Sequence, residues 1–153
     1  MGAWVIDENR VLLTRDLRAP GESIRPLLWV GLNPSTADAS TDDPTTRRII
    51  SFTKRFGYNF VVLINLSTIC SPCPKRLREH KRLNVIEPAP LCKALAGVIN
   101  SVVFCWGNVP PKLVESKSSI ERLGIDAYCL GKTKQGNPKH PLYMSRSTEL
   151  ARV

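Results

Sequence analysis

Three short apolar runs constrain most strongly what this chain can fold into. They are LLWVGL at 27–32, VVLINL at 61–66 and SVVFCW at 101–106. A short, nearly continuous apolar run is typical of a strand that is buried on both faces. Residues 126–130 form a fourth run of this kind. Residues 10–15 (RVLLTR) predict a shorter strand, paired with residues 4–7 at a sheet edge.

Helical segments separate these strands. Residues 44–56 have Asp43 as a suitable N-cap, Pro44 at the first helical position and Gly57 as a stop. Further helices are predicted over 88–99 and over 111–123, the latter closed by Gly124, while 67–87 is expected to be a long basic surface loop. The residues expected on buried helix faces are Ile49, Phe52, Phe56, Leu91, Leu95, Val98 and Ile99.

Strands that alternate with helices predict right-handed crossovers and a three-layer αβα architecture. The fold class is therefore α/β, with a central, mainly parallel sheet of four strands. A chain of 153 residues is long enough for one hydrophobic core, so we expect a single domain over 1–153.

Ligands of such folds bind where the carboxyl ends of the strands meet the following loops. Polar residues occupy those positions at Asn33–Asp38, Asn65–Thr68, Gly107–Asn108 and in the loop that reaches His140. Each motif alone has a structural alternative. Asn-Pro and Ser-Thr can simply build a turn, and a single histidine is more often structural than catalytic.

The formal net charge of +9 favours a polyanionic partner, because each Lys or Arg that neutralises a phosphate releases a counterion. An ordinary basic protein is the alternative. The cations fall into three groups: Arg47, Arg48, Lys54 and Arg55; Lys75, Arg76, Arg78, Lys81 and Arg82; and Lys132, Lys134 and Lys139. The first and third groups flank the polar motifs, which favours nucleic acid.

Five cysteines without an apparent signal peptide predict free thiols and a cytoplasmic location. Cys105 and Cys129 lie in apolar runs and read as core residues. Cys70 and Cys73 form only half of a zinc ligand set, so we expect no metal and no cofactor. No apolar run approaches the roughly 20 residues of a membrane span.

The order of four motifs resembles the uracil-DNA glycosylase superfamily. GLNPS follows the first core strand, LINLS the second, VVFCWG ends the third, and HPLYMSR follows the fourth. More closely, GLNPSTAD, DDPTTRR, the WG pair and GKTKQGNPKHPLY resemble a family of small bacterial and phage proteins known only as a domain of unknown function. The superfamily resemblance covers roughly residues 27–146.

The superfamily resemblance implies roles for individual residues. Asn33 falls where glycosylases orient the attacking water, and Pro34 would shape the turn so that backbone groups face the nucleotide. Asn65 falls at the residue that reads the edge of a flipped base. His140 falls at the motif that stabilises charge on the departing base.

Further roles follow at the rim of the implied pocket. Ser35 replaces a bulky tyrosine of the uracil-specific branch, so a substituted base could enter and uracil need not be the substrate. The resemblance gives no position for the stacking aromatic; Phe52 and Tyr58 are candidates. The residues expected to contact nucleic acid are Thr36, Arg47, Lys139, Ser145 and Arg146, and Ser35 could also contact a phosphate.

The resulting hypothesis is a monomeric, monofunctional DNA glycosylase that hydrolyses the N-glycosidic bond of a flipped uracil or of a modified or mismatched base. A positioned water is expected as the nucleophile because no lysine falls at a nucleophile position. Two alternatives stay open: an enzyme that acts on a free nucleotide or nucleoside, and a non-catalytic nucleic-acid-binding module of the same fold.

Overall fold

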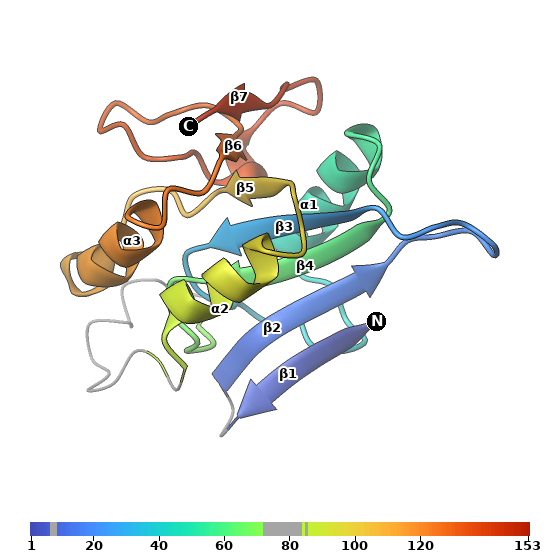
Figure 1. Ribbon diagram of the computed structural model, residues 1–153, viewed down its shortest axis with the longest axis horizontal. Helices are drawn as coiled ribbons and strands as arrows, with labels where there is room; N and C mark the ends of the chain where they lie inside the picture. The colour runs from blue at the N-terminus through green and yellow to red at the C-terminus, as the bar shows by residue number, and fades with distance from the viewer. Residues whose placement is uncertain (7–8, 72–83, 85) are drawn as a thin grey trace.

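A computed structural model describes residues 1–6, 9–71, 84 and 86–153 of the chain (Figure 1). The strands in this part are β1 (Gly2–Ile6), β2 (Asn9–Asp16), β3 (Pro26–Gly31), β4 (Phe60–Asn65), β5 (Val102–Phe104), β6 (Ala127–Cys129) and β7 (Ala151–Arg152). The helices are α1 (Pro44–Arg55), α2 (Pro88–Ala96) and α3 (Val114–Glu121), with single turns at η2 (Pro111–Leu113) and η3 (Pro141–Tyr143).

The described strands form one seven-stranded sheet in the order β1-β2-β4-β3-β5-β6-β7. Strand β3 pairs in parallel with β4 and β5, and β5 pairs in parallel with β6. The pairings β1–β2, β2–β4 and β6–β7 are antiparallel. The predicted sheet of four mainly parallel strands is therefore correct only in part, because antiparallel strands extend it on both sides into a mixed sheet.

Two hydrophobic clusters, one on each face of the sheet, give the chain its layers. Helix α1 packs on one face, where Phe52 and Ile49 contact Trp29 and its neighbours. Helices α2 and α3 cover the other face, where Cys92 and Ile120 join the opposite side chains of β3, β4 and β5. Figure 1 shows α2 and α3 in front of the sheet and α1 behind it. The predicted three layers are present.

Helix α1 begins and ends where its sequence predicts. The side chain of Asp43 accepts a hydrogen bond from the Thr46 backbone N–H at 2.7 Å, and Pro44 occupies the first turn. Gly57 follows the helix with φ of 83°, a conformation that glycine adopts without strain. Because α1 is fixed at both ends, its amino terminus lies at a defined place beside the ends of β3 and β4.

Two local predictions are corrected, and one strand was not predicted. Val98, expected on a buried helix face, is 76% exposed because α2 ends at Ala96. Residues 67–87, expected as a surface loop, begin with the buried Ser67, Thr68 and Ile69, which continue inward from β4; most of this segment lies outside the described residues. The strand that was not predicted is β7, which pairs with β6. At 12 residues α1 is the longest described helix, and no described helix could cross a membrane.

Candidate functional site

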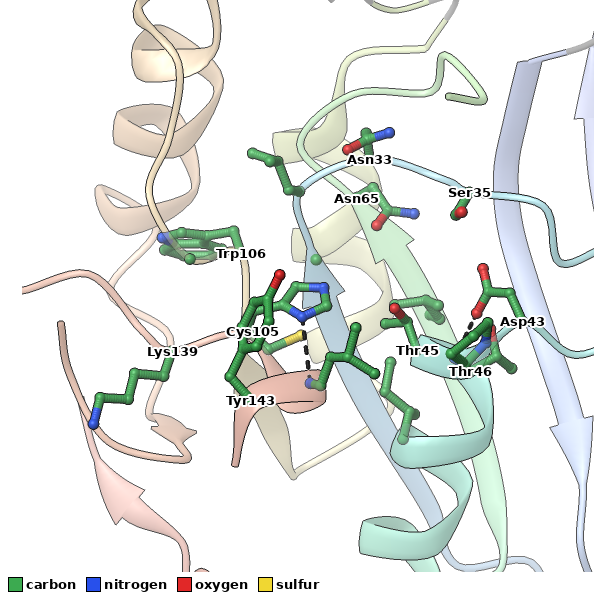
Figure 2. A pocket seen from close by; sticks show the side chains of 18 of the residues that line it. Asn33, Ser35, Asp43, Thr45, Thr46, Asn65, Cys105, Trp106, Lys139 and Tyr143 are labelled. Atoms are coloured by element: carbon green, nitrogen blue, oxygen red, sulfur yellow. Dashed lines mark hydrogen bonds between the residues drawn. The ribbon is translucent and has the colours of Figure 1, made fainter. Parts of the chain in front are cut away.

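A cavity of about 740 Å³ opens at the carboxyl ends of β3, β4 and β5. The amino terminus of α1 and the η3 turn complete its wall. Figure 2 shows Asn33 and Asn65 at one end, Ser35 and Asp43 along one side, and Cys105 and Trp106 along the other. The predicted site residues that line it are Asn33, Ser35, Asn65, Lys139 and His140.

The side chain of Asn33 is fixed by two hydrogen bonds from its amide nitrogen. Its Nδ2 donates to the carbonyl oxygens of Pro34 at 2.9 Å and Ser71 at 2.8 Å. Both amide hydrogens are thereby used, which fixes the side chain and leaves Oδ1 as its acceptor. Pro34 does not line the cavity, and its carbonyl serves instead to orient Asn33.

Asn65 is buried, yet its side-chain amide is free to bind a ligand. Its residue is 7% exposed, and its side-chain amide makes no hydrogen bond with the part of the chain that the structure describes. It lies beside Gly31, its register partner on β3, where an added Cβ would stand 2.6 Å from Oδ1 of Asn65. Gly31 therefore gives this amide its place at the cavity end, with donor and acceptor both free for a ligand.

His140 caps the η3 turn, and this contact selects its tautomer. Its Nδ1 accepts a hydrogen bond from the backbone N–H of Leu142 at 3.3 Å. The neutral ring therefore carries its hydrogen on Nε2. Burial lowers the pKa of His140, while the nearby negative charge of Asp43 opposes this shift. A neutral N–H donor is the form that this position favours near pH 7.

The Trp106-Gly107 pair positions the loop that carries His140. The backbone N–H of Gly107 donates to the carbonyl of Pro138 at 2.8 Å, and Gly107 has φ of 69°. A Cβ on Gly107 would lie 3.6 Å from the Cβ of His140. The WG and HP motifs, more than 30 residues apart in sequence, therefore form one local structure.

Four residues predicted to contact nucleic acid lie outside the cavity lining, namely Thr36, Arg47, Ser145 and Arg146. All four are exposed. They stay candidates for contacts around the mouth. Part of the first basic group is engaged within the chain: Arg48 donates to the Met144 carbonyl, and Arg55 bonds to residues 147–149. These two arginines tie α1 to the C-terminal segment.

The two aromatic candidates for base stacking both lie outside the cavity lining. Phe52 is 2% exposed and packs between Trp29 and Phe56. Tyr58 donates to the hydroxyl of Ser101 at 2.7 Å. Neither lines the cavity. The aromatic residues that do line it are Trp106, which is 1% exposed, and Tyr143, which is 83% exposed.

Two charged residues of the cavity wall were not predicted as site residues. Asp43, read only as a helix cap, is 5% exposed and lines the cavity. Arg10, read only as part of an edge strand, is 3% exposed and also lines it. A charge within an otherwise apolar strand pattern was the available signal for Arg10, since buried charges need a partner.

The four described cysteines are three buried core residues and one exposed thiol. Cys92, Cys105 and Cys129 are buried, and burial raises the pKa of the Cys92 thiol to about 11. Cys70 is exposed, and Cys73 lies outside the described residues. Among the residues that the structure describes, no group of three or more His, Cys, Asp or Glu side chains is placed to hold a metal ion.

Comparison with known families matches residues 10–142 to DUF1643, a family described as proteins of unknown function. The chain belongs to this family. The match contains all the cavity-lining residues except Tyr143 and Met144, so nearly the whole site lies within the family's domain. No curated protein and no solved structure matches the chain. The resemblance to the uracil-DNA glycosylase superfamily stays a prediction.

Proposed function

We propose that this chain is a monofunctional DNA glycosylase that hydrolyses the N-glycosidic bond of a flipped base. The observation that carries the proposal is the uncommitted amide of Asn65, 7% exposed at the end of a 740 Å³ cavity. A buried amide with free donor and acceptor suits the hydrogen-bonding edge of a base. The glycosylase-like motif order of the sequence supplies the reaction class.

Asn33 and His140 supply complementary chemistry in this proposal. A water bonded to Oδ1 of Asn33 would be oriented without losing a proton to it, because an amide is not a base at neutral pH. The water oxygen bonds to C1′ of the sugar while the glycosidic electron pair leaves with the base. The Nε2–H of His140 stabilises the negative charge that develops on the base, a contribution of about 3 kcal/mol for one oriented donor.

Asp43 accepts the proton that the water loses in this proposal. Among the described residues that line the cavity, Asp43 is the only one with a carboxylate side chain. Its oxygens already accept from Thr46 N–H at 2.7 Å and Ala37 N–H at 3.4 Å, which leaves lone pairs available. Lys139 also lines the cavity, but Figure 2 shows its side chain extending away from Asn33 and Asn65, which supports a water nucleophile over a lysine.

The test is an excision assay. Oligonucleotides that carry uracil, mismatched thymine, hypoxanthine or 5-substituted pyrimidines are incubated as single and double strands, then treated with alkali to cut abasic sites. Cleavage of at least one substrate is expected, with losses of about 100- to 1,000-fold in His140→Ala and a comparable loss in Asn33→Ala. Asn100→Ala, an exposed asparagine remote from the cavity, is the matched control.

DNA binding is measured on the same oligonucleotides at several salt concentrations. A binder of nucleic-acid polymers loses affinity steeply as salt rises. Absence of cleavage across the panel together with absence of salt-sensitive binding would overturn the proposal. Cleavage that persists in both Asn33→Ala and His140→Ala would remove these residues from the mechanism.

A further inference from the structure

Arg10 is a buried cation whose hydrogen bonding is incomplete. It is 3% exposed on β2 and lines the cavity. Its Nη1 donates to the carbonyl oxygen of Ala37, whereas Nε is fully buried with no partner. Leaving a buried charged group without its full set of partners destabilises a fold, so such a group needs an explanation.

Arg15, on the same strand, shows what a structural arginine looks like here. It is 1% exposed, forms an ion pair with Asp42 at 2.7 Å, and donates to the carbonyl oxygens of Thr14 and Asp38. Arg10 has no ion-pair partner among the described residues. The carboxylate of Asp43 interacts with it only at longer range and forms no ion pair with it in the described part of the chain. Arg15 is therefore fully engaged in holding the fold together, whereas Arg10 is not.

The surroundings of Arg10 favour an anion. Arg10 bonds to Ala37, whose backbone N–H in turn donates to Asp43, which places the guanidinium beside the Ser35–Asp43 loop and the first turn of α1. The amino terminus of a 12-residue helix carries partial positive charge. Two permanent cations, Arg10 and Lys139, line the cavity against the single carboxylate of Asp43 in the described part of the chain. Burial lowers the pKa of Arg10, but an arginine stays charged at neutral pH.

We propose that Arg10 binds an anionic group, a carboxylate or a phosphate, that the substrate carries into the cavity. A guanidinium that is 3% exposed does not reach the backbone phosphates of DNA lying on the surface. The anion must therefore enter the cavity, either as an acidic substituent on an extruded base or as the phosphate of a free nucleotide. Ser35 also lines the cavity, on the side where Figure 2 shows Asp43, and its small side chain would leave room for a substituent. This inference rests on the site of the proposed function: an acidic base substituent narrows its substrate class, whereas a nucleotide phosphate favours an enzyme that acts on free nucleotides.

Two ligand pairs test the inference by calorimetry. Uracil is compared with 5-carboxyuracil, and 2′-deoxyuridine is compared with its 5′-monophosphate. In at least one pair the acidic member should bind about 10- to 100-fold more tightly, as expected for a charge-assisted hydrogen bond. Arg10→Met should abolish that preference and Arg10→Lys should retain part of it. The pair that shows the preference identifies whether the anion is a base substituent or a phosphate.

Arg25→Met, which removes an exposed arginine remote from the cavity, is the matched control and should leave the preference intact. Because Arg10→Met also removes the bond to Ala37, the Nε–H resonance of Arg10 in the unmodified protein is followed during titration with each acidic ligand. Equal affinities within both pairs would overturn the inference, as would a preference that survives in folded Arg10→Met or an unmoved Arg10 resonance. Excision of neutral bases together with equal affinities within both ligand pairs would overturn this inference and leave the glycosylase proposal standing. An acid preference without any excision would count against the glycosylase proposal alone.

Discussion

Gly31→Ala is expected to disable the proposed recognition of a base by Asn65 without unfolding the sheet. Gly31 ends β3 directly opposite Asn65, and its backbone does not have the positive φ that an alanine would resist. The added Cβ would stand 2.6 Å from Oδ1 of Asn65, whereas its next neighbours, at 3.7 and 3.8 Å, lie at ordinary contact distances. The clash therefore falls on one side chain.

The structure sets the size of the effect. To reach an ordinary contact of 3.4 Å the Asn65 amide must retreat by about 0.8 Å or rotate away. A displacement of about 1 Å in a positioning group can lower the rate by about 100-fold. Losing one or two hydrogen bonds to the base costs about 1–3 kcal/mol, which gives a similar range. We expect Gly31→Ala to reduce kcat/KM by about 10- to 100-fold.

A double-mutant cycle measures whether Gly31 acts through Asn65. Gly31→Ala, Asn65→Ala and the double variant are compared on one substrate from the excision panel, with thermal unfolding as the folding control. If the alanine acts only by displacing Asn65, the double variant should be no worse than Asn65→Ala. Additive losses, or normal activity in Gly31→Ala, would refute the reasoning, as would an unshifted side-chain amide resonance of Asn65.

Three further predictions follow. Asp43→Asn keeps an equally good helix cap but removes the proposed proton acceptor, so the thermal midpoint should change little while excision falls at least 10-fold. Undiminished excision would show that Asp43 acts only as a helix cap. Burial lowers the pKa of His140, so the unfolded chain binds its proton more readily than the folded one. Stability measured by urea unfolding should therefore decline as pH falls from 7.5 through 6.5 toward the lowered pKa, and His140→Gln should flatten that decline. Thr53→Val leaves the Nε1–H of buried Trp29 without the acceptor it has at 3.0 Å, which should cost about 1–3 kcal/mol in chemical denaturation, whereas Thr53→Ser should cost less.

The core of the fold was predictable because its signals are local. Buried strands read as apolar runs, and α1 carries its cap, its proline and its stop within 15 residues. The outer part of the sheet was harder to predict. Strand β7 is only two exposed residues, Ala151 and Arg152, and its pairing with β6 depends on the path of the chain rather than on periodicity. The mixed character of the sheet follows from such edges.

The cavity residues also divide into those with a local sequence signal and those placed only by packing. Asn33, Asn65 and His140 could be placed because each lies at or after the end of a core strand, and strand ends in a parallel arrangement meet at one edge. Arg10 and Asp43 were missed as site residues because each has a satisfactory local reading, as an edge-strand cation and a helix cap. The prediction that Asp43 caps α1 is confirmed. Only the packing of β2 and α1 against the ends of β3 and β4 brings both charges to one wall.

The hydrogen bonds and contacts of the cavity side chains indicate a site that is formed before its ligand binds. The backbone uses one end of Asn33 and one ring nitrogen of His140, which fixes the direction of the end that remains. Asn65 is placed by the absence of a side chain at Gly31, and Arg10 is held by a single carbonyl. Groups oriented in this way need little reorganisation when charge develops, which is where a buried site gains most over water. A polar cluster that served only stability would instead satisfy its members with one another, as Arg15 and Asp42 do.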